Sequence, residues 1–488
     1  MNSKGKKEDE AMFDDFRSFI EAIDKKGELE RVEGADWDLE IGTITELFAE
    51  RRGHALLFDK VKGYPKGYRI ASNVVMTPRR QRIAFGIPEE MPEVEVIRDW
   101  KDKFNRYKPV PTKEVKTGPV MENVLKEEEV NILKFPTPKW HEKDGGRYIG
   151  TGVVTITKDP EEGWINCGTY RVMIQDEKTL AFYSSVGKHA VIAREKYWGK
   201  GENCPVVMCF GQDMLLFAMS TMQLPWGMSE LEAAGYIKDK PIEVIRGPIT
   251  GLPIPATAEI VIEGFSPPPA VDSRHEGPFG EWTGYYASGS RNEPVVHLKA
   301  IYHRNDPILH GQPPVKPPAN TWYPIPLHTA VTLWNRLEVA GMPGIKGVYV
   351  HGPGNRIIAV ISIKQSYVGH AKQVGTLAAT MLSGGACSGR YIIVVDEDID
   401  PAEWESVMWA FTTRCNPEDS IEIVRGFLTS PLDPMLPPEK REKRDFTTAK
   451  VIINACKPYY WMKDFPPVNR ASDELRRKIL DRWPNIFR

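Results

Sequence analysis

Residues 149–183, IGTGVVTITKDPEEGWINCGTYRVMIQDEKTLAFY, give the clearest indication of architecture in the chain. Three runs rich in β-branched, apolar and aromatic residues are separated by two turn-forming segments, DPEEG at 159–163 and DEK at 176–178. Strand-like runs joined by segments of hairpin length are typical of antiparallel sheets. We therefore predict an antiparallel meander across this stretch.

Strand-like runs continue beyond this meander, with helix-like segments among them. The strand-like runs are 204–211, 242–246, 258–263 and 295–302, and the helix-like segments are 189–197 and 212–221. Many strands with few helices between them favour a sheet that curls toward closure. A barrel-like β domain with helical inserts is therefore the expected centre of the protein.

The sequences on both sides of this centre alternate between helical and strand-like patterns. Near the start, Phe13, Phe16, Ile20 and Ile23 recur at helical spacing before Gly27. Beyond a proline-rich passage at 310–326, strand-like runs surround a helical segment; the runs are 347–349, 357–363 and 391–395, and the helix is 371–382. The fold class predicted for the whole chain is α/β, with several domains.

These changes in pattern set the predicted domain boundaries. We expect an N-terminal α/β domain at 1–115, a barrel domain at 116–325, a C-terminal α/β domain at 326–465 and a terminal helix at 466–488. Ser472 is placed to cap the last helix, which carries acidic residues in its first turn and basic residues later, as the helix dipole favours. Docking on a partner subunit and an end that stays with its own chain are alternatives for this helix.

The composition is that of a folded protein, with 41% hydrophobic and 27% charged residues. The 64 basic and 66 acidic residues nearly cancel, so the chain lacks the electrostatic footprint of nucleic-acid binding. No stretch approaches the roughly 20 apolar residues that span a bilayer. The six cysteines are too scattered for a zinc site or a disulfide scaffold. We expect a cytoplasmic protein with no nucleic-acid partner and no membrane span.

The segment with the strongest chemical character is DSRHEGPFGEWTGY at 272–285. Two glycines and a proline between Glu276 and Glu281 disfavour a regular helix and let the backbone approach a ligand. Phe279 and Trp282 would desolvate the carboxyl groups, and desolvation raises a carboxyl pKa toward the range that proton donation requires. The alternative is a surface turn with two solvated glutamates.

A second candidate segment, WINCGTYRVM at 164–173, is expected to be a strand. Asn166 offers an amide oxygen, and Arg171 offers a planar fork that pairs with carboxylates at two points. Arg171 could orient a substrate carboxylate, and a structural salt bridge fits the sequence equally well. Residues five apart on a strand point to opposite faces, so the two side chains diverge unless Gly168 marks a bulge or both serve one long ligand.

Two further candidates begin predicted helices. His189 follows Gly187 at a helix start, where backbone amides could meet a phosphate and a neutral imidazole could bind a metal. Glu230 follows Ser229 at another helix start, where first-turn capping is the simpler explanation. An amide oxygen, an imidazole and a carboxylate together would bind a divalent cation and leave positions open for phosphate oxygens.

Taken together, six blocks resemble the UbiD family of prenylated-flavin decarboxylases, in the family's order. The blocks are INCGTYR (165–171), KH (188–189), GMSELEAAG (227–235), PATAEIVIEG (255–264), HEGPFGEWTGYY (275–286) and VVDEDID (394–400). The resemblance covers the chain from about residue 10 to about residue 460. It implies an N-terminal α/β domain, a central split β-barrel of flavin-reductase type, and a C-terminal α/β domain ending in a dimer-contacting helix.

The resemblance also implies a role for each matching residue. Asn166, His189 and Glu230 match the family's ligands for a divalent metal, usually Mn²⁺, which bridges to the phosphate of prenylated FMN, with K⁺ nearby. Arg171, Glu276 and Glu281 match the catalytic network, with Glu281 as the proton donor. The residues implied at the cofactor are Asn166, Cys167, Arg171, Lys188, His189, Ser220, Met222, Glu230 and Arg390, and those expected at the substrate are Trp322, His328 and Leu432.

By this resemblance the protein catalyses reversible, non-oxidative decarboxylation of an aromatic, heteroaromatic or α,β-unsaturated carboxylic acid. A flavin prenyltransferase would supply the cofactor, and the protein would be a homodimer or homohexamer. One alternative is an FMN-dependent reductase on the same barrel, although the chain has no dinucleotide-binding glycine fingerprint. The other is a non-catalytic subunit of a carboxylase complex.

Overall fold

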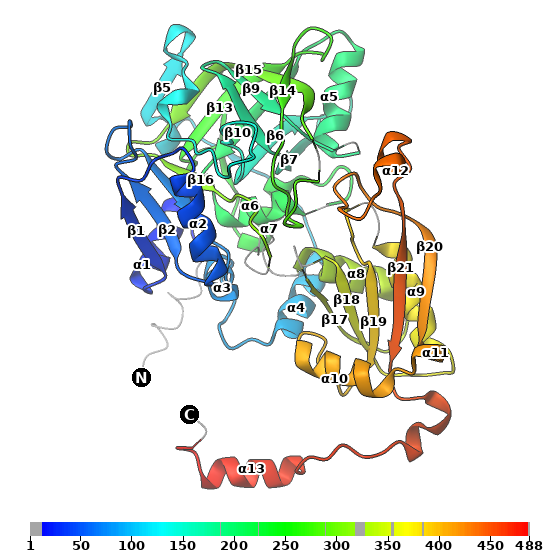
Figure 1. The fold of residues 1–488 in the computed structure, drawn as a ribbon. Helices are drawn as coiled ribbons and strands as arrows, with labels where there is room; N and C mark the ends of the chain where they lie inside the picture. Colours follow the sequence, from blue (N-terminus) through cyan, green and yellow to red (C-terminus); the bar gives the residue numbers. More distant parts are fainter. Residues whose placement is uncertain are drawn as a thin grey trace.

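The computed structural model describes residues 12–185, 187–222, 224–287, 289–317, 327–352, 356–382 and 385–486. The strands of these residues form four sheets. Figure 1 shows the N-terminal elements beside the central sheet, the C-terminal sheet next to both, and the last helix leading away from the body. No helix of the described chain has the length and apolar character needed to cross a membrane.

The N-terminal part alternates helices and strands as predicted. Its elements are α1 (Phe16–Lys25), β1 (Leu29–Glu33), α2 (Glu40–Glu50), β2 (Ala55–Asp59), β3 (Arg69–Ser72), α3 (Pro78–Ala84) and α4 (Glu93–Asn105). The apolar stripe of α1 is buried, and Asp15 caps its first turn. The sheet has the order β1-β2-β3-β16, so β16 (Ile308–Gly311), from much later in the chain, completes it.

The central sheet is antiparallel throughout and has nine strands. They are β5 (Asn123–Lys126), β6 (Val153–Lys158), β7 (Ile165–Gly168), β8 (Val172–Asp176), β9 (Thr179–Phe182), β10 (Cys204–Phe210), β13 (Ile260–Ser266), β14 (Ser273–Glu276) and β15 (Arg291–His303). The order is β7-β6-β10-β13-β15-β9-β8, and both β5 and β14 also pair with β15. The described strands form an open path and no closed barrel, so the flavin-reductase type of barrel stays a prediction.

Two details of the predicted β domain are wrong. The predicted strand at 164–173 is two strands, β7 and β8, which lie at opposite ends of the sheet, so the segment is no simple meander. The break occurs because the chain leaves the ladder after Gly168, and the Thr169 amide donates to the Ser220 carbonyl instead. In addition, β11 (Glu243–Arg246), the predicted strand at 242–246, lies outside the central sheet and joins a separate sheet with β12 (Pro253–Pro255) and β4 (Lys113–Glu114).

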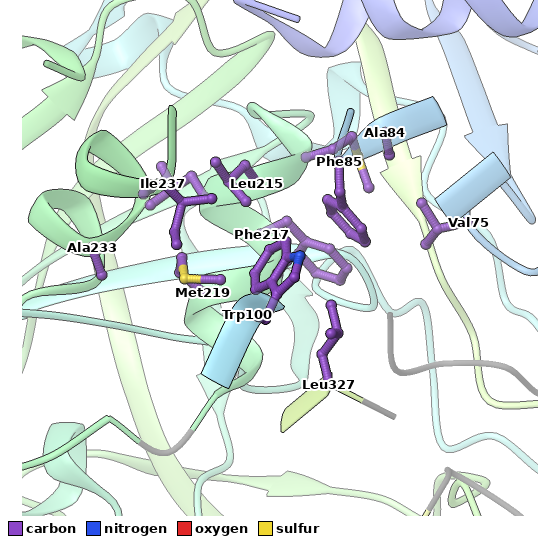
Figure 2. Close-up of a cluster of buried hydrophobic side chains, with 14 of the residues drawn as sticks. Val75, Ala84, Phe85, Trp100, Leu215, Phe217, Met219, Ala233, Ile237 and Leu327 are labelled. Carbon is purple, nitrogen blue, oxygen red and sulfur yellow. The ribbon is translucent and has the colours of Figure 1, made fainter. Parts of the chain in front are cut away.

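One hydrophobic core joins the three parts of the chain around α6 (Met214–Thr221). This helix is apolar on nearly every side and almost fully buried, as expected of a central helix. Figure 2 shows Phe217 and Met219 of α6 among side chains from the N-terminal part, from α7 (Glu230–Lys238) and from α8 (Leu327–Val339). The ends of α6 and α7 that face β7 are therefore held firmly.

One further α-helix and three 3-10 turns complete the central part. They are α5 (His189–Gly199) and the 3-10 turns η1 (Pro119–Glu122), η2 (Glu127–Glu129) and η3 (Ile132–Lys134). The predicted start of α5 is confirmed, with Lys188 at its N-cap and Gly187 before it at a φ of 84°.

The C-terminal part is a five-stranded sheet with helices around it, as the sequence pattern predicted. After α8 come β17 (Ile345–His351), β18 (Ile358–Ile363), α9 (His370–Met381), β19 (Tyr391–Asp396), α10 (Trp404–Arg414), α11 (Pro417–Ser420), β20 (Ile421–Leu428), α12 (Pro438–Glu442), β21 (Thr447–Ala455), η5 (Tyr459–Asp464) and α13 (Asp473–Arg482). The sheet order is β17-β18-β19-β21-β20. Ser472 caps α13 as predicted, and no residue of this helix is buried.

Candidate active site

Arg171 and the two glutamates of the 272–285 segment meet in one buried cluster. Arg171 lies between β7 and β8, Glu276 ends β14, and Glu281 lies in the loop that follows. The Arg171 Nε and Nη2 atoms donate to the Glu276 Oε1 and Oε2 atoms at 2.9 and 2.7 Å, and Nη1 donates to Glu281 Oε1 at 2.8 Å. The alternative of a solvated surface turn is therefore wrong for this loop.

Aromatic residues enclose this cluster. Phe279 and Trp282 are buried, as their expected role as apolar walls requires. The Arg171 Cζ atom lies 4.2 Å from the centroid of the Tyr183 ring and 5.6 Å from that of Phe279, both within cation–π range. The guanidinium is thus shielded from water on its faces, and its edges carry the hydrogen bonds to the glutamates.

The sequence reasoning missed Tyr148, whose hydroxyl donates to Glu276 Oε1 at 2.8 Å. Its neighbours contain the signal that could have indicated it, the paired glycines at 145 and 146. The Gly145 amide donates to the Pro278 carbonyl at 2.8 Å, and a Cβ at Gly145 would lie 2.0 Å from the Gly277 carbonyl oxygen. Glycine at 145 therefore permits the close approach of this loop to the Glu276–Glu281 loop.

The two glutamates differ in their surroundings, and burial shifts the pKa of Glu281. Desolvation raises the pKa of Glu281 to about 7, which the charge of Arg171 opposes and that of Glu276 reinforces. Glu276 is almost completely enclosed and accepts three hydrogen bonds, from Arg171 twice and from Tyr148 once. A carboxyl group that titrates near neutral pH beside a fixed carboxylate and a cation is suited to general acid catalysis.

The candidate metal ligands Asn166 and Glu230 lie next to each other. Glu230 begins α7, and its buried Oε2 atom accepts a hydrogen bond from the Cys167 amide of β7 at 2.7 Å. The cap residue Ser229 makes no side-chain cap bond, and the Glu230 carboxylate interacts with its own backbone amide at the helix start as well as with the strand. The Asn166 Nδ2 atom donates to Thr157 Oγ1 at 3.3 Å, which leaves its amide oxygen for a ligand.

His189 contacts two aromatic residues that are sequence neighbours of Asn166 and Glu230. Its ring packs edge-on against Trp164 and Trp226, with centroids 5.4 and 5.2 Å apart, and these tryptophans lie close in sequence to Asn166 and Glu230. Burial, and then the charge of Lys188, lower the pKa of His189, which favours the neutral imidazole that binds metals. The described residues contain no group of three His, Cys, Asp or Glu side chains placed to hold a metal, but this donor set includes one asparagine.

An amide oxygen, a neutral imidazole and a buried carboxylate fit a divalent cation. The three come from β7, α5 and α7, and the carboxylate of Glu230 is buried with a backbone amide as its hydrogen-bond partner. The break after β7 also separates Asn166, which lies on β7, from Arg171, which lies between β7 and β8, so the alternation of a single strand does not apply to this pair. The conflict expected for a single regular strand disappears.

The other residues expected at the cofactor lie in the central part, except Arg390, which lies in the C-terminal part. Cys167 is buried on β7, and Ser220 and Met222 lie at the end of α6, which meets β7 through the Thr169–Ser220 bond. Lys188 caps α5, where burial and then the charge of Arg356 lower its pKa to about 8. Arg390 lies in the C-terminal part, in an ion pair with Asp433.

Of the three residues expected at the substrate, His328 and Leu432 lie in the C-terminal part. Trp322 is outside the described residues. His328 is near the start of α8, where burial, and then the charges of Arg356 and Lys188, lower its pKa to about 3. Leu432 is half-buried beside Asp433. Arg356 also lies over the ring of Trp282, 5.3 Å from its centroid, so the C-terminal part contacts the loop that carries Glu281.

Three family models match consecutive parts of the chain. All are described as domains of 3-octaprenyl-4-hydroxybenzoate carboxy-lyase: the N-terminal domain at 20–103, the Rift-related domain at 112–317 and the C-terminal domain at 324–455. Together they cover most of the sequence.

Curated relatives are similar over nearly their whole length. A phenolic acid decarboxylase of Bacillus subtilis (strain 168) is 31% identical, with 91% of this chain and 93% of that protein covered. A pyrrole-2-carboxylic acid decarboxylase of Pseudomonas aeruginosa is 30% identical, with 96% and 97% covered.

Solved structures agree with the fold. The vanillic acid decarboxylase of Sedimentibacter hydroxybenzoicus in its open form has a TM-score of 0.81 and 26% identity, covering 97% of this chain and 99% of that one. The UbiD-class enzyme HmfF from Pelotomaculum thermopropionicum, in complex with FMN, has a TM-score of 0.81 and 27% identity, covering 96% and 99%.

Proposed function

The chain belongs to the UbiD family of carboxy-lyases, and on that basis we propose that it reversibly decarboxylates an aromatic, heteroaromatic or α,β-unsaturated acid with prenylated FMN. The observation that carries the proposal is the buried cluster in which Arg171 binds both Glu276 and Glu281. Relatives named for phenolic and pyrrole carboxylic acids, and a UbiD-class enzyme in complex with prenylated FMN, support the substrate class and the cofactor.

Each residue of the cluster has a separate task in this proposal. When bound, prenylated FMN supplies the electron sink for loss of carbon dioxide. Arg171 presents a fixed positive charge that positions the substrate carboxylate. Glu281 is protonated below about pH 7 and donates its proton to the carbon that has lost carbon dioxide. In the reverse direction the same carboxylate removes that proton.

The candidate metal ligands would hold the cofactor's phosphate end. Asn166, His189 and Glu230 would bind Mn²⁺ or another divalent ion there, with K⁺ nearby, and the donor set supports this. The other residues assigned to the cofactor are Cys167, Lys188, Ser220, Met222 and Arg390. Those assigned to the substrate pocket are Trp322, His328 and Leu432.

The exposed terminal helix supports an oligomer. Leu475, Ile479 and Trp483 follow one another at four-residue spacing, and all are exposed. We assign α13 as a contact of a homodimer, or of a homohexamer built from dimers. The domain boundaries at 115, 325 and 465 and the split form of the central barrel belong to the same proposal. A flavin prenyltransferase would be the source of the cofactor.

Production of the protein with and without a flavin prenyltransferase tests the proposal. Protein made with the prenyltransferase should carry a prenylated flavin and release carbon dioxide from at least one of 4-hydroxybenzoate, vanillate and pyrrole-2-carboxylate. Glu281→Gln should keep the flavin spectrum and lose turnover. Oxidation of a nicotinamide by the protein with ordinary FMN would instead indicate the reductase. Bound flavin without turnover on any conjugated acid would indicate the non-catalytic subunit.

A further inference from the structure

We propose that Tyr148 is a positioning residue of the decarboxylase: its hydroxyl commits Glu276 to Arg171 and leaves Glu281 as the carboxyl group that carries the proton. This inference rests on the proposed function and deepens it. It concerns a residue outside the Arg171, Glu276 and Glu281 cluster that the sequence indicated.

Packing fixes the Tyr148 hydroxyl in one direction. The residue is completely buried, and its ring lies against Phe279, with centroids 4.1 Å apart. The hydroxyl oxygen lies 2.8 Å from Glu276 Oε1 and 3.4 Å from the Pro278 carbonyl oxygen. Burial and the neighbouring Glu276 raise the pKa of Tyr148, so this hydroxyl keeps its proton and acts as a donor at every working pH.

The two glutamates are not equivalent as hydrogen-bond acceptors. Glu276 accepts at both oxygens from the Arg171 fork and once more from Tyr148, an arrangement that matches the acceptor sites of an ionised carboxylate. Glu281 accepts a single side-chain hydrogen bond, from Arg171, among the bonds of the described residues. The site therefore holds its one negative charge on Glu276 and places the exchangeable proton on Glu281.

The other charged groups around Glu276 and Glu281 do not remove this difference in hydrogen bonding. Asp144 acts on Tyr148 from the 141–148 loop, and Arg291, which is ion-paired with Glu293, acts on Glu281 from β15. Arg171 contacts both carboxyl groups. Tyr148 thus adds to the preference that the two-point contact of Arg171 gives Glu276, because its hydroxyl contacts Glu276 alone of the two carboxyl groups.

Loss of this hydroxyl should let the two carboxyl groups share the proton more equally, as coupled carboxyl pairs do. In Tyr148→Phe the ring packing stays and one donor to Glu276 disappears. On the basic limb of the decarboxylation pH profile most molecules have both carboxyl groups ionised, so the fraction with a proton on Glu281 depends on Glu281 itself and the rate at pH 8 should be nearly unchanged. Near pH 6, where the pair holds one proton, Glu276 should take a share of that proton, so the rate of Tyr148→Phe should fall by up to about twofold. Flavin binding should not change.

Tyr302→Phe is the matched control. Tyr302 is also buried, and its hydroxyl donates to a buried carboxylate, Glu263 Oε2, at 2.7 Å, but neither residue contacts Arg171. This variant should lose a similar amount of stability and keep the wild-type pH profile. A loss of rate in Tyr148→Phe that is the same at all pH values would mean a structural role only, and would overturn the inference.

A titration without turnover separates this inference from the proposed function. In apoprotein with ¹³C-labelled glutamate, the Glu281 signal is assigned by its loss in Glu281→Gln. Its titration midpoint should fall in Tyr148→Phe and stay unchanged in Tyr302→Phe. An unchanged midpoint in Tyr148→Phe overturns the inference even if the wild type is an active decarboxylase.

If Tyr148→Phe does not fold, Glu276→Gln replaces it. Removing the negative charge of Glu276 must also lower the titration midpoint of Glu281, and an unchanged midpoint in Glu276→Gln would equally overturn the inference. Absence of turnover in the wild type would contradict the proposed function alone.

Discussion

Arg171 reaches Glu281 through one hydrogen bond, Nη1 to Oε1 at 2.8 Å, although it gives two to the neighbouring Glu276. Glu281, whose side chain is only 11% exposed, therefore has part of the stabilisation that an enclosed carboxylate needs, and desolvation raises its pKa to about 7. A carboxyl group in this position can lose and regain a proton near neutral pH.

Decarboxylation should consequently become slower as the pH rises through about 7. The reason is that Glu281 must be protonated to donate, and its protonated fraction falls about tenfold for each pH unit above its pKa. Initial rates at saturating substrate between pH 5 and 9 check this. A rate that rises steadily across pH 7 would contradict the assignment of Glu281 as the donor.

Arg171→Lys should lower the rate of decarboxylation by about a hundredfold or more. Lysine carries the same charge at a single point, and it cannot bind both oxygens of Glu276 while also reaching Glu281. Arg274→Lys is the control, because Arg274 pairs with Asp272 at an exposed position. The measurement is the steady-state rate of both variants, with the flavin content determined in each. Near-normal turnover in Arg171→Lys would show that two-point binding by a guanidinium group is not required.

Glu230→Gln should lose the divalent metal and retain flavin poorly. The substitution keeps the shape of the side chain but removes the only carboxylate of the three-residue set, and hard cations need that charge. Glu232→Gln lies in the same turn of α7 and should behave as the wild type. Metal content by mass spectrometry and flavin content by absorbance are the measurements. Stoichiometric metal in purified Glu230→Gln would exclude Glu230 as a ligand.

The sequence predicted the elements whose signals are local. The apolar spacing of Phe16, Ile20 and Ile23 and the cap at Ser472 each predicted a helix that the structure contains. The glycines and proline between Glu276 and Glu281 likewise predicted an irregular loop with a chemical character. These features depend on neighbouring residues, so one sequence is sufficient to read them.

The features that the sequence did not predict depend on contacts between residues far apart in the chain. Arg171 and Glu276 are 105 positions apart, and only the family resemblance, not their spacing, indicated that they act together. The run at 164–173 has strand composition throughout, but the Thr169–Ser220 bond interrupts the ladder and sends β7 and β8 to opposite ends of the sheet. Strand propensity cannot report such a break, because pairing partners decide where a strand ends.

Gly145→Ala should destabilise the protein by about 1–3 kcal/mol. The added Cβ would lie 2.0 Å from the Gly277 carbonyl oxygen, so the loop before Tyr148 must move away from the loop that carries Glu276 and Glu281. Gly199→Ala is the control, since a Cβ at the end of α5 meets nothing within 4 Å and should be neutral or slightly stabilising. Chemical denaturation of both variants gives the free energies, and an unchanged Gly145→Ala would mean that the two loops do not approach as described.

Ile479→Glu should dissociate the proposed dimer. Ile479 lies between Leu475 and Trp483 on one stripe of α13, and these three side chains are 36%, 48% and 47% exposed, respectively, in the single chain. A helix with no buried residue and many charges gains little from its own chain, so burial of this stripe against a second copy is the interaction that would hold it in place. Lys478→Gln changes the charge by the same one unit at a neighbouring position outside the stripe, and it should leave the assembly intact. Sedimentation velocity of the two variants and the wild type measures the outcome: equal dissociation of both variants would indicate a general effect of charge, and dimers in both would show that the stripe of α13 does not form the contact.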